Sequence, residues 1–209
     1  MYDLYTWSTP NGRKVSIMLE ELGVPYDAHA IDIGQDMQFD PEFLTISPNN
    51  KIPAIVDREA GLSLMESGAI LLYLAEKHGQ FLGEGTARLR VIEWLMWQMG
   101  GLGPMAGQAH HFLKYNRGKS AYAEERYGQE TQRLYGVLNK RLEGSAHVGG
   151  TEYSIADMAI WPWVSRFEWQ QIDLASFPAV CTWYERIAAR PAVARGYHVP
   201  VPQPSIPMP

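Results

Sequence analysis

The chain has 209 residues, of which 46% are hydrophobic and 20% are charged, the composition of an ordinary globular protein. Its formal net charge of −5 argues against a nucleic-acid partner. No stretch reaches the roughly 18 uninterrupted apolar residues that a membrane span needs, and the first residues lack a basic region followed by an apolar one. We therefore expect a cytoplasmic protein without a membrane partner.

Cysteine usage limits the chemistry further. The single cysteine, Cys181, excludes an internal disulfide, a Cys-x-x-Cys redox pair and a zinc site built from several cysteines. His110 and His111 are adjacent, and neighbours on a helix point about 100° apart, so we expect no metal site there. If the protein carries out sulfur chemistry, most of the sulfur must come with a ligand.

The first 80 residues alternate between strand and helix patterns. Strands are predicted over residues 2–7, 25–33, 51–57 and 62–66, and a short helix over 40–46. Two longer helices should end at Gly23 and at Gly79, and Ser67 should cap the start of the second. The order β-α-β-α-β-β-α is typical of a thioredoxin-like α/β unit, a small mixed sheet with helices on both faces.

The rest of the chain is predicted to be all-helical. Helical patterns cover residues 87–113, where Pro104 should kink or break the helix, and later stretches up to about residue 191. Ser154 and Asp157 have the spacing of a capping box before an apolar run. Residues 199–209 form a proline-rich tail that we expect to be extended.

Charge supports a boundary near residue 80. Residues 1–80 hold 5 basic and 12 acidic side chains, whereas the remaining residues hold 13 and 11. We therefore predict an N-terminal domain over residues 1–80, a helical domain over 87–198 and the tail over 199–209.

A proline interrupts the predicted strand in "SPNNKIPAIV". Because a proline inside a strand removes a ladder hydrogen bond, Pro53 should lie at a sheet edge or at a bend with a cis bond. Either arrangement leaves the backbone of Ile52 available to an extended peptide, which would bind by strand addition. An edge proline without a ligand is the alternative interpretation.

The stretch "MESGAI" opens a predicted helix at Glu66 and Ser67. The N-terminus of a helix favours a carboxylate, and Glu66 supplies a negative charge for an adjacent amine. A simple helix cap is the alternative. Together with the proline segment, these residues favour a small peptide ligand with a free α-amino acid end.

Five stretches of the chain resemble one known family. "TPNGRKVSIMLEELGVPY", "SPNNKIPAIVD", "ESGAILLYLAEK", "GGLGPMAGQAHHF" and "YSIADMAIWPWV" are similar to cytosolic glutathione transferases, most closely to the bacterial nu-class enzymes that act as glutathione-dependent disulfide-bond oxidoreductases. The resemblance runs from residue 2 to about residue 195. It implies a thioredoxin-like glutathione-binding domain, an all-helical C-terminal domain and a homodimer with two active sites.

The resemblance also implies a set of site residues. Thr9 and Asn11 would lie at the glutathione sulfur, and the remaining residues would bind the tripeptide. Gln38 and Lys51 would contact its glycine end or backbone, Ile52 beside cis-Pro53 its cysteinyl backbone, Glu66 and Ser67 its γ-glutamyl group, and Arg126 would reach it from the C-terminal domain, within the chain or across the dimer.

Glutathione would bring the sulfur that the chain lacks. A thiol with a pKa near 8.5 is mostly protonated at neutral pH, and lowering that pKa by about two units takes roughly 2.7 kcal/mol. The helix that follows the turn "STPN" can stabilise the thiolate through its dipole, the Asn11 N–H and the Thr9 hydroxyl, since Pro10 has no N–H. Tyr5 and Ser8 are alternative hydroxyl donors.

The resemblance favours an enzyme that reduces small disulfides with reduced glutathione, needs no metal and uses no cysteine of its own. It suggests that the site also holds glutathione disulfide, and that weak transferase or peroxidase activity accompanies the reaction. Two alternatives remain open at this point. One is a conventional glutathione transferase that conjugates electrophiles, and the other is a non-catalytic glutathione-binding regulatory module.

Overall fold

The structure, a computed structural model that describes residues 1–209, divides into two units by its internal contacts. Unit 1 comprises Met1–Gln80 and Ala189–Ile206, and unit 2 comprises Phe81–Ala188 and Pro207–Pro209. The domain limits proposed from the sequence differ from these units, because Ala189–Ile206 packs with the N-terminal part of the chain. Those limits stay predictions.

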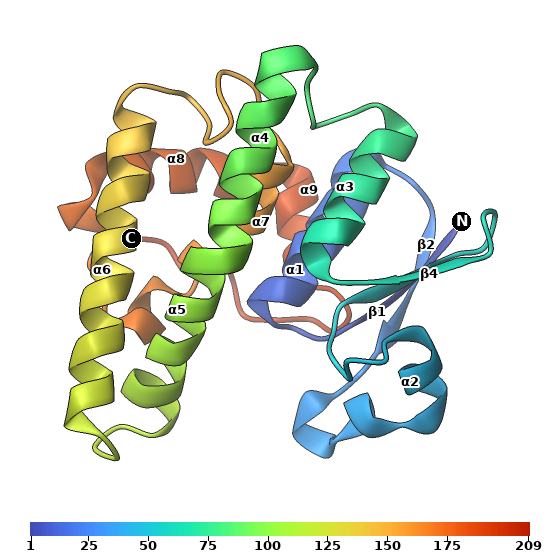
Figure 1. Cartoon of the computed structure of the whole chain (residues 1–209), viewed down its shortest axis with the longest axis horizontal. Helices are drawn as coiled ribbons and strands as arrows, with labels where there is room; N and C mark the ends of the chain where they lie inside the picture. The colour runs from blue at the N-terminus through green and yellow to red at the C-terminus, as the bar shows by residue number, and fades with distance from the viewer. The chain divides into compact units, whose positions relative to one another are not determined.

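A four-stranded mixed sheet forms the centre of unit 1 (Figure 1). It consists of β1 (Tyr2–Thr6), β2 (Tyr26–Ala30), β3 (Ala54–Asp57) and β4 (Leu62–Met65). The strand order is β2-β1-β3-β4, with β1 parallel to β2 and antiparallel to β3, and β3 antiparallel to β4. The predicted small mixed sheet is confirmed, although each strand is shorter than its sequence pattern.

Three helices cover the two faces of this sheet. They are α1 (Pro10–Leu22), α2 (Pro41–Ile46) and α3 (Ser67–His78). On the side of α2, Phe43 joins Ile31 and Ala54 in a small buried core, and the ring of Tyr5 lies 6.1 Å from that of Phe43. On the other side, the buried Asp57 of β3 accepts hydrogen bonds from Tyr73 and Lys77 of α3. The predicted βαβαββα order with helices on both faces is therefore confirmed.

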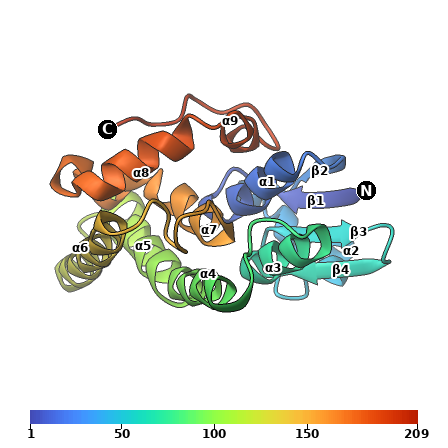
Figure 2. The ribbon, with the colours of Figure 1, turned by 90° about the horizontal axis from the view of Figure 1, so that it is seen from above.

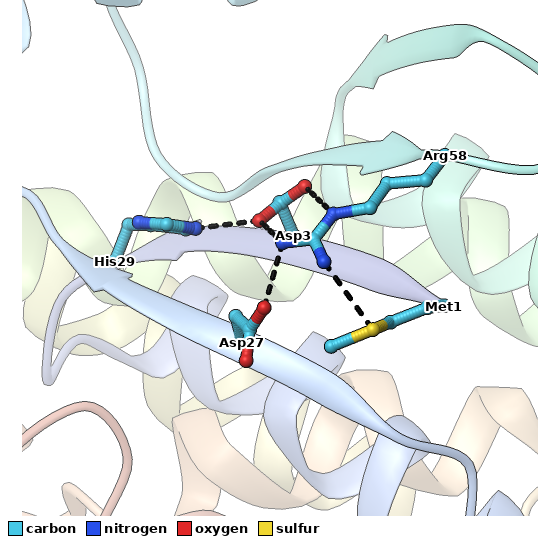
Figure 3. A network of polar contacts seen from close by, with 5 residues as sticks. All are labelled: Met1, Asp3, Asp27, His29 and Arg58. Atoms are coloured by element: carbon cyan, nitrogen blue, oxygen red, sulfur yellow. Dashed lines mark hydrogen bonds and ion pairs between the residues drawn. The ribbon is translucent and has the colours of Figure 1, made fainter.

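A network of charged residues joins three segments of unit 1 (Figure 3). Arg58, just after β3, donates from Nε to Oδ2 of Asp3 on β1 at 2.6 Å and from Nη2 to Asp27 on β2 at 2.6 Å. His29 of β2 lies 2.7 Å from the same Asp3 carboxylate. The hydrogen bonds from Arg58 hold the pKa of Asp3 down, to about 2.

The segment after residue 188 packs on α1. Its helix α9 (Pro191–Tyr197) lies beside α1 in both views (Figures 1 and 2). Ser16 Oγ donates to the Gly196 carbonyl at 2.7 Å, and a side chain at Gly196 would meet the Ile17 backbone, since an added Cβ would lie 2.7 Å from its Cα. The Arg13 guanidinium lies 3.5 Å from the centre of the Tyr197 ring.

Unit 2 is all-helical, as predicted. It contains α4 (Gly85–Trp97), α5 (Gly103–Ala109), α6 (Ala121–Glu143), α7 (Ile155–Val164) and α8 (Pro178–Ala188). Ser154 and Asp157 form the predicted capping box at the start of α7. The buried Asp157 carboxylate also accepts from Val148 N and Trp183 Nε1, each at 2.9 Å. No helix of the structure is both long and apolar enough to cross a membrane.

Pro104 does not break the helix in which it lies. A π-helical turn, Gln98–Leu102, directly precedes it, and α5 continues from Gly103 into a second π-turn, His110–Tyr115. A π-turn contains one extra residue, which moves the proline ring away from the carbonyl that it would meet in a regular α-helix. The helix therefore continues through Pro104, and the interruption predicted at this point is a change from regular α-helix to π-helical turns before and after α5.

Candidate active site

The register of the sheet gathers three of the predicted binding segments at one end of it. Tyr5 near the end of β1 pairs with Ala54 at the start of β3, and Ala54 pairs with Met65 at the end of β4. The turn after β1 leads into α1, the chain before β3 carries Ile52 and Pro53, and the chain after β4 carries Glu66 and Ser67. These three segments are separate in sequence, and the pairing of the strands brings them to one end of the sheet.

The first of these segments is the start of α1. Thr9 is the N-cap of the helix, and its Oγ1 accepts a hydrogen bond from Gly12 N at 3.1 Å. A hydroxyl that accepts in this way still carries a proton to donate. Pro10 is the first helical residue, so Asn11 takes the second position, at the positive end of the helix dipole. No acidic residue in the first turn neutralises that end.

Close packing fixes the path of this turn. A Cβ at Gly12 would lie 2.2 Å from the Trp7 carbonyl oxygen and 2.5 Å from Thr6 Oγ1. Only glycine fits there without a shift of the backbone. The sequence "STPNG" therefore sets the position of the Thr9 hydroxyl as well as its chemistry.

Tyr5 is poorly placed as an alternative donor to a thiolate. Its ring stacks on His29 at 4.6 Å and lies close to Phe43, on the face of the sheet that α2 covers. Burial raises the pKa of Tyr5, which disfavours its ionised form. Ser8 is half-buried in the turn between β1 and α1, so it stays an alternative by position.

The second segment is the bend before β3. The peptide bond between Ile52 and Pro53 is cis, one of the two arrangements predicted from the sequence. β3 is an interior strand, so the edge-strand alternative is wrong. Because the paired part of β3 begins at Ala54, the backbone of Ile52 takes no part in the ladder. Lys51 is exposed directly before it.

The third segment is the junction between β4 and α3. Glu66 is exposed and has φ 71° and ψ 109°, a conformation that side chains other than glycine rarely adopt. Such strain costs about 1–3 kcal/mol and is found where the surrounding structure and a function require it. Ser67 is 4% exposed and is the first residue of α3, so the prediction that it caps the helix is wrong by one residue: the cap is Glu66.

Lys14 joins the first and third segments, and the sequence interpretation did not include it. It is 1% exposed, and its Nζ donates to Ser67 Oγ at 3.3 Å. Burial lowers the pKa of Lys14 to about 7, while the charge of Glu66 acts in the opposite direction. A signal was present, because Lys14 lies one helical turn before Met18, on the apolar stripe of α1.

Gln38 belongs to none of these three segments and lies in a short helical turn, Met37–Phe39, before α2. Its Nε2 donates to Asp36 Oδ1 at 3.4 Å, and its Oε1 is buried without a hydrogen-bond partner. The hydrogen bonds and strand pairing of the structure do not connect Gln38 with Thr9 or Ser67.

Arg126 lies on α6 of unit 2. It is exposed and lines a surface groove of about 640 Å³, together with Met105 of α5 and further residues of α6. Tyr122, which is 73% exposed, and Arg133 are among these.

The two adjacent histidines and the cysteine have separate surroundings within unit 2. His110 is buried between Trp163 and Gln170, and burial lowers its pKa to about 4, so it is neutral at physiological pH. His111 is exposed and lies beside Asn116. Cys181 on α8 is half-buried, and burial raises the pKa of its thiol, which disfavours a reactive thiolate.

Comparison with known proteins identifies the family to which this two-part fold belongs. Residues 4–83 match the family model of the glutathione S-transferase N-terminal domain, and residues 102–191 match that of the C-terminal domain. The disulfide-bond oxidoreductase YfcG of Escherichia coli is 57% identical over 201 residues, covering 93% of this chain and 94% of YfcG. The chain belongs to the glutathione S-transferase family, as its resemblance to these enzymes predicted.

Further relatives agree in fold and in sequence. The disulfide-bond oxidoreductase YghU of Escherichia coli is 43% identical over 209 residues, covering 92% of this chain and 73% of YghU. A glutathione transferase of Burkholderia graminis, solved with two glutathione molecules per subunit, has a TM-score of 0.90 and 45% identity, covering 95% of this chain and 88% of that one. One of Pseudomonas putida, solved with one glutathione disulfide per subunit, has a TM-score of 0.90 and 44% identity, covering 95% and 91%.

Proposed function

We propose that the protein is a glutathione-dependent disulfide-bond oxidoreductase that reduces small disulfides without a cysteine of its own. The observation that carries this proposal is the start of α1, where the Thr9 hydroxyl and the positive end of the helix dipole stand in the place of a Cys-x-x-Cys pair. The identity to YfcG and YghU supports the same conclusion.

The proposed ligand is glutathione, in its reduced or its disulfide form. Its thiolate would accept hydrogen bonds from Thr9 and from the Asn11 N–H, while its cysteinyl backbone would pair with Ile52 beside Pro53. Glu66 and Ser67 would bind the γ-glutamyl group, and Gln38 and Lys51 the glycine end or the backbone. Support comes from the sheet register, which brings the Thr9, Ile52 and Glu66 segments to one end of unit 1. No metal is needed for these steps.

The reaction would proceed by two exchanges. In the first, the bound thiolate attacks one sulfur of the substrate disulfide, a mixed disulfide forms and the second sulfur leaves as a thiolate, which takes up a proton. In the second, another glutathione thiolate attacks the glutathione sulfur of the mixed disulfide and releases the second substrate thiol. Two molecules of glutathione are oxidised to glutathione disulfide, and one substrate disulfide is reduced to two thiols.

A homodimer in the cytoplasm, where reduced glutathione is abundant, is part of this proposal. Leu89 and Met96 on α4, and Tyr122 on α6, are large side chains that are 63%, 48% and 73% exposed. Aromatic residues and methionine are enriched at protein–protein interfaces, so Met96 and Tyr122 are candidates for a dimer contact. Arg126 lies in the groove beside Tyr122, so a second copy seated on this surface would meet it.

Steady-state turnover of a small model disulfide with glutathione tests the proposal, with conjugation of an aromatic halide by the same protein as the comparison. We expect disulfide reduction to exceed conjugation by orders of magnitude. Dominant conjugation would instead identify a conventional transferase. Glutathione binding without either turnover would identify a regulatory binding module.

A further inference from the structure

Lys14 is a buried ammonium that the proposed chemistry does not use. Lysine is almost never fully buried unless something compensates for the lost hydration. At this position on α1 a methionine or a leucine would match the apolar stripe, so a charge there opposes the folding of the helix against its neighbours. Charged side chains are normally kept off the buried face of a helix, and exceptions to this rule are expected mainly at functional sites.

The contact of Lys14 points to that function. Its Nζ donates to Ser67 Oγ at 3.3 Å, and Ser67 is the first residue of α3. A hydroxyl that accepts from an ammonium becomes a stronger donor through its own proton, because hydrogen bonds in a chain polarise one another. The positive charge of Lys14 and the positive N-terminal end of α3 therefore both favour an anion next to Ser67.

The charges at this junction are complementary to an α-amino acid end. Glu66 presents an exposed carboxylate, while Lys14 supplies a buried positive charge behind the next residue in the chain. A zwitterion has one ammonium and one carboxylate attached to the same carbon. Its ammonium would face Glu66, and its carboxylate would face Ser67 and, behind it, Lys14.

We propose that Lys14 is a positioning residue that acts through Ser67 and makes the site specific for a ligand with a free α-carboxylate at its γ-glutamyl end. This inference rests on the proposed function. The low pKa that burial gives Lys14 agrees with it, because a carboxylate bound beside Ser67 would favour the charged form of the lysine and be favoured by it in return.

Two glutathione analogues separate the two charges of the γ-glutamyl group. The γ-aminobutyryl analogue (γ-aminobutyryl-cysteinylglycine) keeps the amine and lacks the α-carboxylate, whereas the glutaryl analogue (glutaryl-cysteinylglycine) keeps the carboxylate and lacks the amine. Dissociation constants of these two peptides and of glutathione are to be measured by titration calorimetry. The proteins are the wild type, Lys14→Met, Lys14→Gln and, as a surface control, Lys140→Met on α6, which is exposed.

We expect the wild type to bind glutathione at least about tenfold more tightly than the γ-aminobutyryl analogue, since a hydrogen bond to a charged group has roughly this effect. Lys14→Met should weaken binding of glutathione and of the glutaryl analogue about tenfold, and leave the γ-aminobutyryl analogue almost unchanged. A general structural defect would instead weaken all three peptides equally. Lys140→Met should match the wild type.

Two results would overturn the inference while the proposed function survives. One is equal affinity of the wild type for glutathione and the γ-aminobutyryl analogue, and the other is an unchanged ratio of the two affinities in both Lys14 variants. Lys14→Gln keeps the measurement decisive if Lys14→Met fails to fold, because the amide still donates to Ser67 without a charge. If the wild type binds none of the three peptides, the proposed function itself is wrong.

Discussion

Thr9 Oγ1 accepts a hydrogen bond from Gly12 N at 3.1 Å, so the residue that caps α1 has its hydroxyl fixed at the positive end of that helix. The same hydroxyl is the proposed donor to the glutathione thiolate. One oxygen atom therefore both caps the helix and would donate to the thiolate. Substitutions of Thr9 are needed to measure the two effects separately.

Replacing Thr9 by alanine removes both roles, whereas replacing it by serine keeps both. We expect Thr9→Ala to lower kcat/KM for disulfide reduction by about 10- to 100-fold, since a hydrogen bond to an anion is lost. Glutathione affinity should fall less than turnover, because the hydroxyl acts mainly on the thiolate. The lost cap should also reduce the free energy of unfolding by about 1 kcal/mol.

Thr9→Ser should retain most of the turnover, and Thr151→Ala, an exposed loop change in unit 2, should retain all of it. Steady-state rates measure the turnover of each variant, and glutathione titrations measure its affinity. Unchanged turnover in Thr9→Ala would remove the residue from the mechanism and leave Ser8 as the alternative donor.

Lys14→Met should make the protein more stable at pH 6, by at least about 1 kcal/mol. The pKa of Lys14 is about 7 in the folded protein, below the ordinary value of 10.5. The unfolded chain therefore binds more protons between these two values. Burial of Lys14 therefore lowers the free energy of unfolding by its full amount below pH 7. This loss of stability disappears as the pH rises to 10.5 and above.

Urea denaturation of the wild type and of Lys14→Met at several pH values shows which of the two is more stable. The advantage of the variant should shrink steadily between pH 7 and pH 10. A Lys14→Met protein that is less stable than the wild type at pH 6 would show that the lysine stabilises the fold, which contradicts the cost inferred from its burial.

The Asp3 and Arg58 pair predicts an acid-sensitive contribution to the stability of unit 1. The pKa of Asp3 is lowered to about 2 from an ordinary value of 3.8, chiefly by hydrogen bonds from Arg58. Asp3→Asn should therefore reduce the free energy of unfolding by about 1–2 kcal/mol at neutral pH. The difference from the wild type should decline below about pH 4 and be lost as the pH falls through about 2.

Thermal denaturation between pH 2 and pH 7 measures this difference, and Asp27→Asn is the matched control. Asp27 pairs with the same Arg58, but its side chain is 49% exposed against 12% for Asp3, so its replacement should matter less. A stability difference for Asp3→Asn that does not vary with pH would contradict the role of its carboxylate.

Two glycine-to-alanine changes should have opposite effects on stability. An added Cβ at Gly196 would lie 2.7 Å from Ile17 Cα, so Gly196→Ala should cost about 1–3 kcal/mol through the displacement of α9 from α1. Gly136, in the middle of α6, has no atom within 4 Å of an added Cβ, and Gly136→Ala should stabilise by about 0.5–1 kcal/mol. Chemical denaturation compares them, and a neutral Gly196→Ala would mean that α9 does not depend on this close contact.

The fold was largely predictable because periodicity and caps are local signals. The helix stops at Gly23 and Gly79 lie where the structure has left-handed C-caps. The predicted strands were longer than the observed ones, since pairing with neighbouring strands, and not composition, decides where β2 ends and where β3 begins. Pro104 marked the interrupted part of its helix correctly, but the π-helical turn found there has no local sequence signal.

The site was only partly predictable, because its residues come together through the sheet register. The start of α1, the Ile52 bend and the Glu66 junction each had a local motif. Lys14 had none of its own, and only its position on an apolar stripe marked it as unusual. No local signal indicated that Ala189–Ile206 belongs with unit 1, because that requires contacts between residues far apart in the sequence.

In the proposed reaction glutathione, and not the protein, supplies the sulfur that attacks the disulfide, and the first variant to measure is Cys181→Ser. Cys181 is the single cysteine, so its replacement leaves no thiol in the protein. We expect this variant to reduce a small disulfide with glutathione at a kcat and a KM within about twofold of the wild type, since the proposed exchange uses no protein thiol. A loss of turnover in a variant that still folds and binds glutathione would show instead that a protein thiol takes part in the exchange.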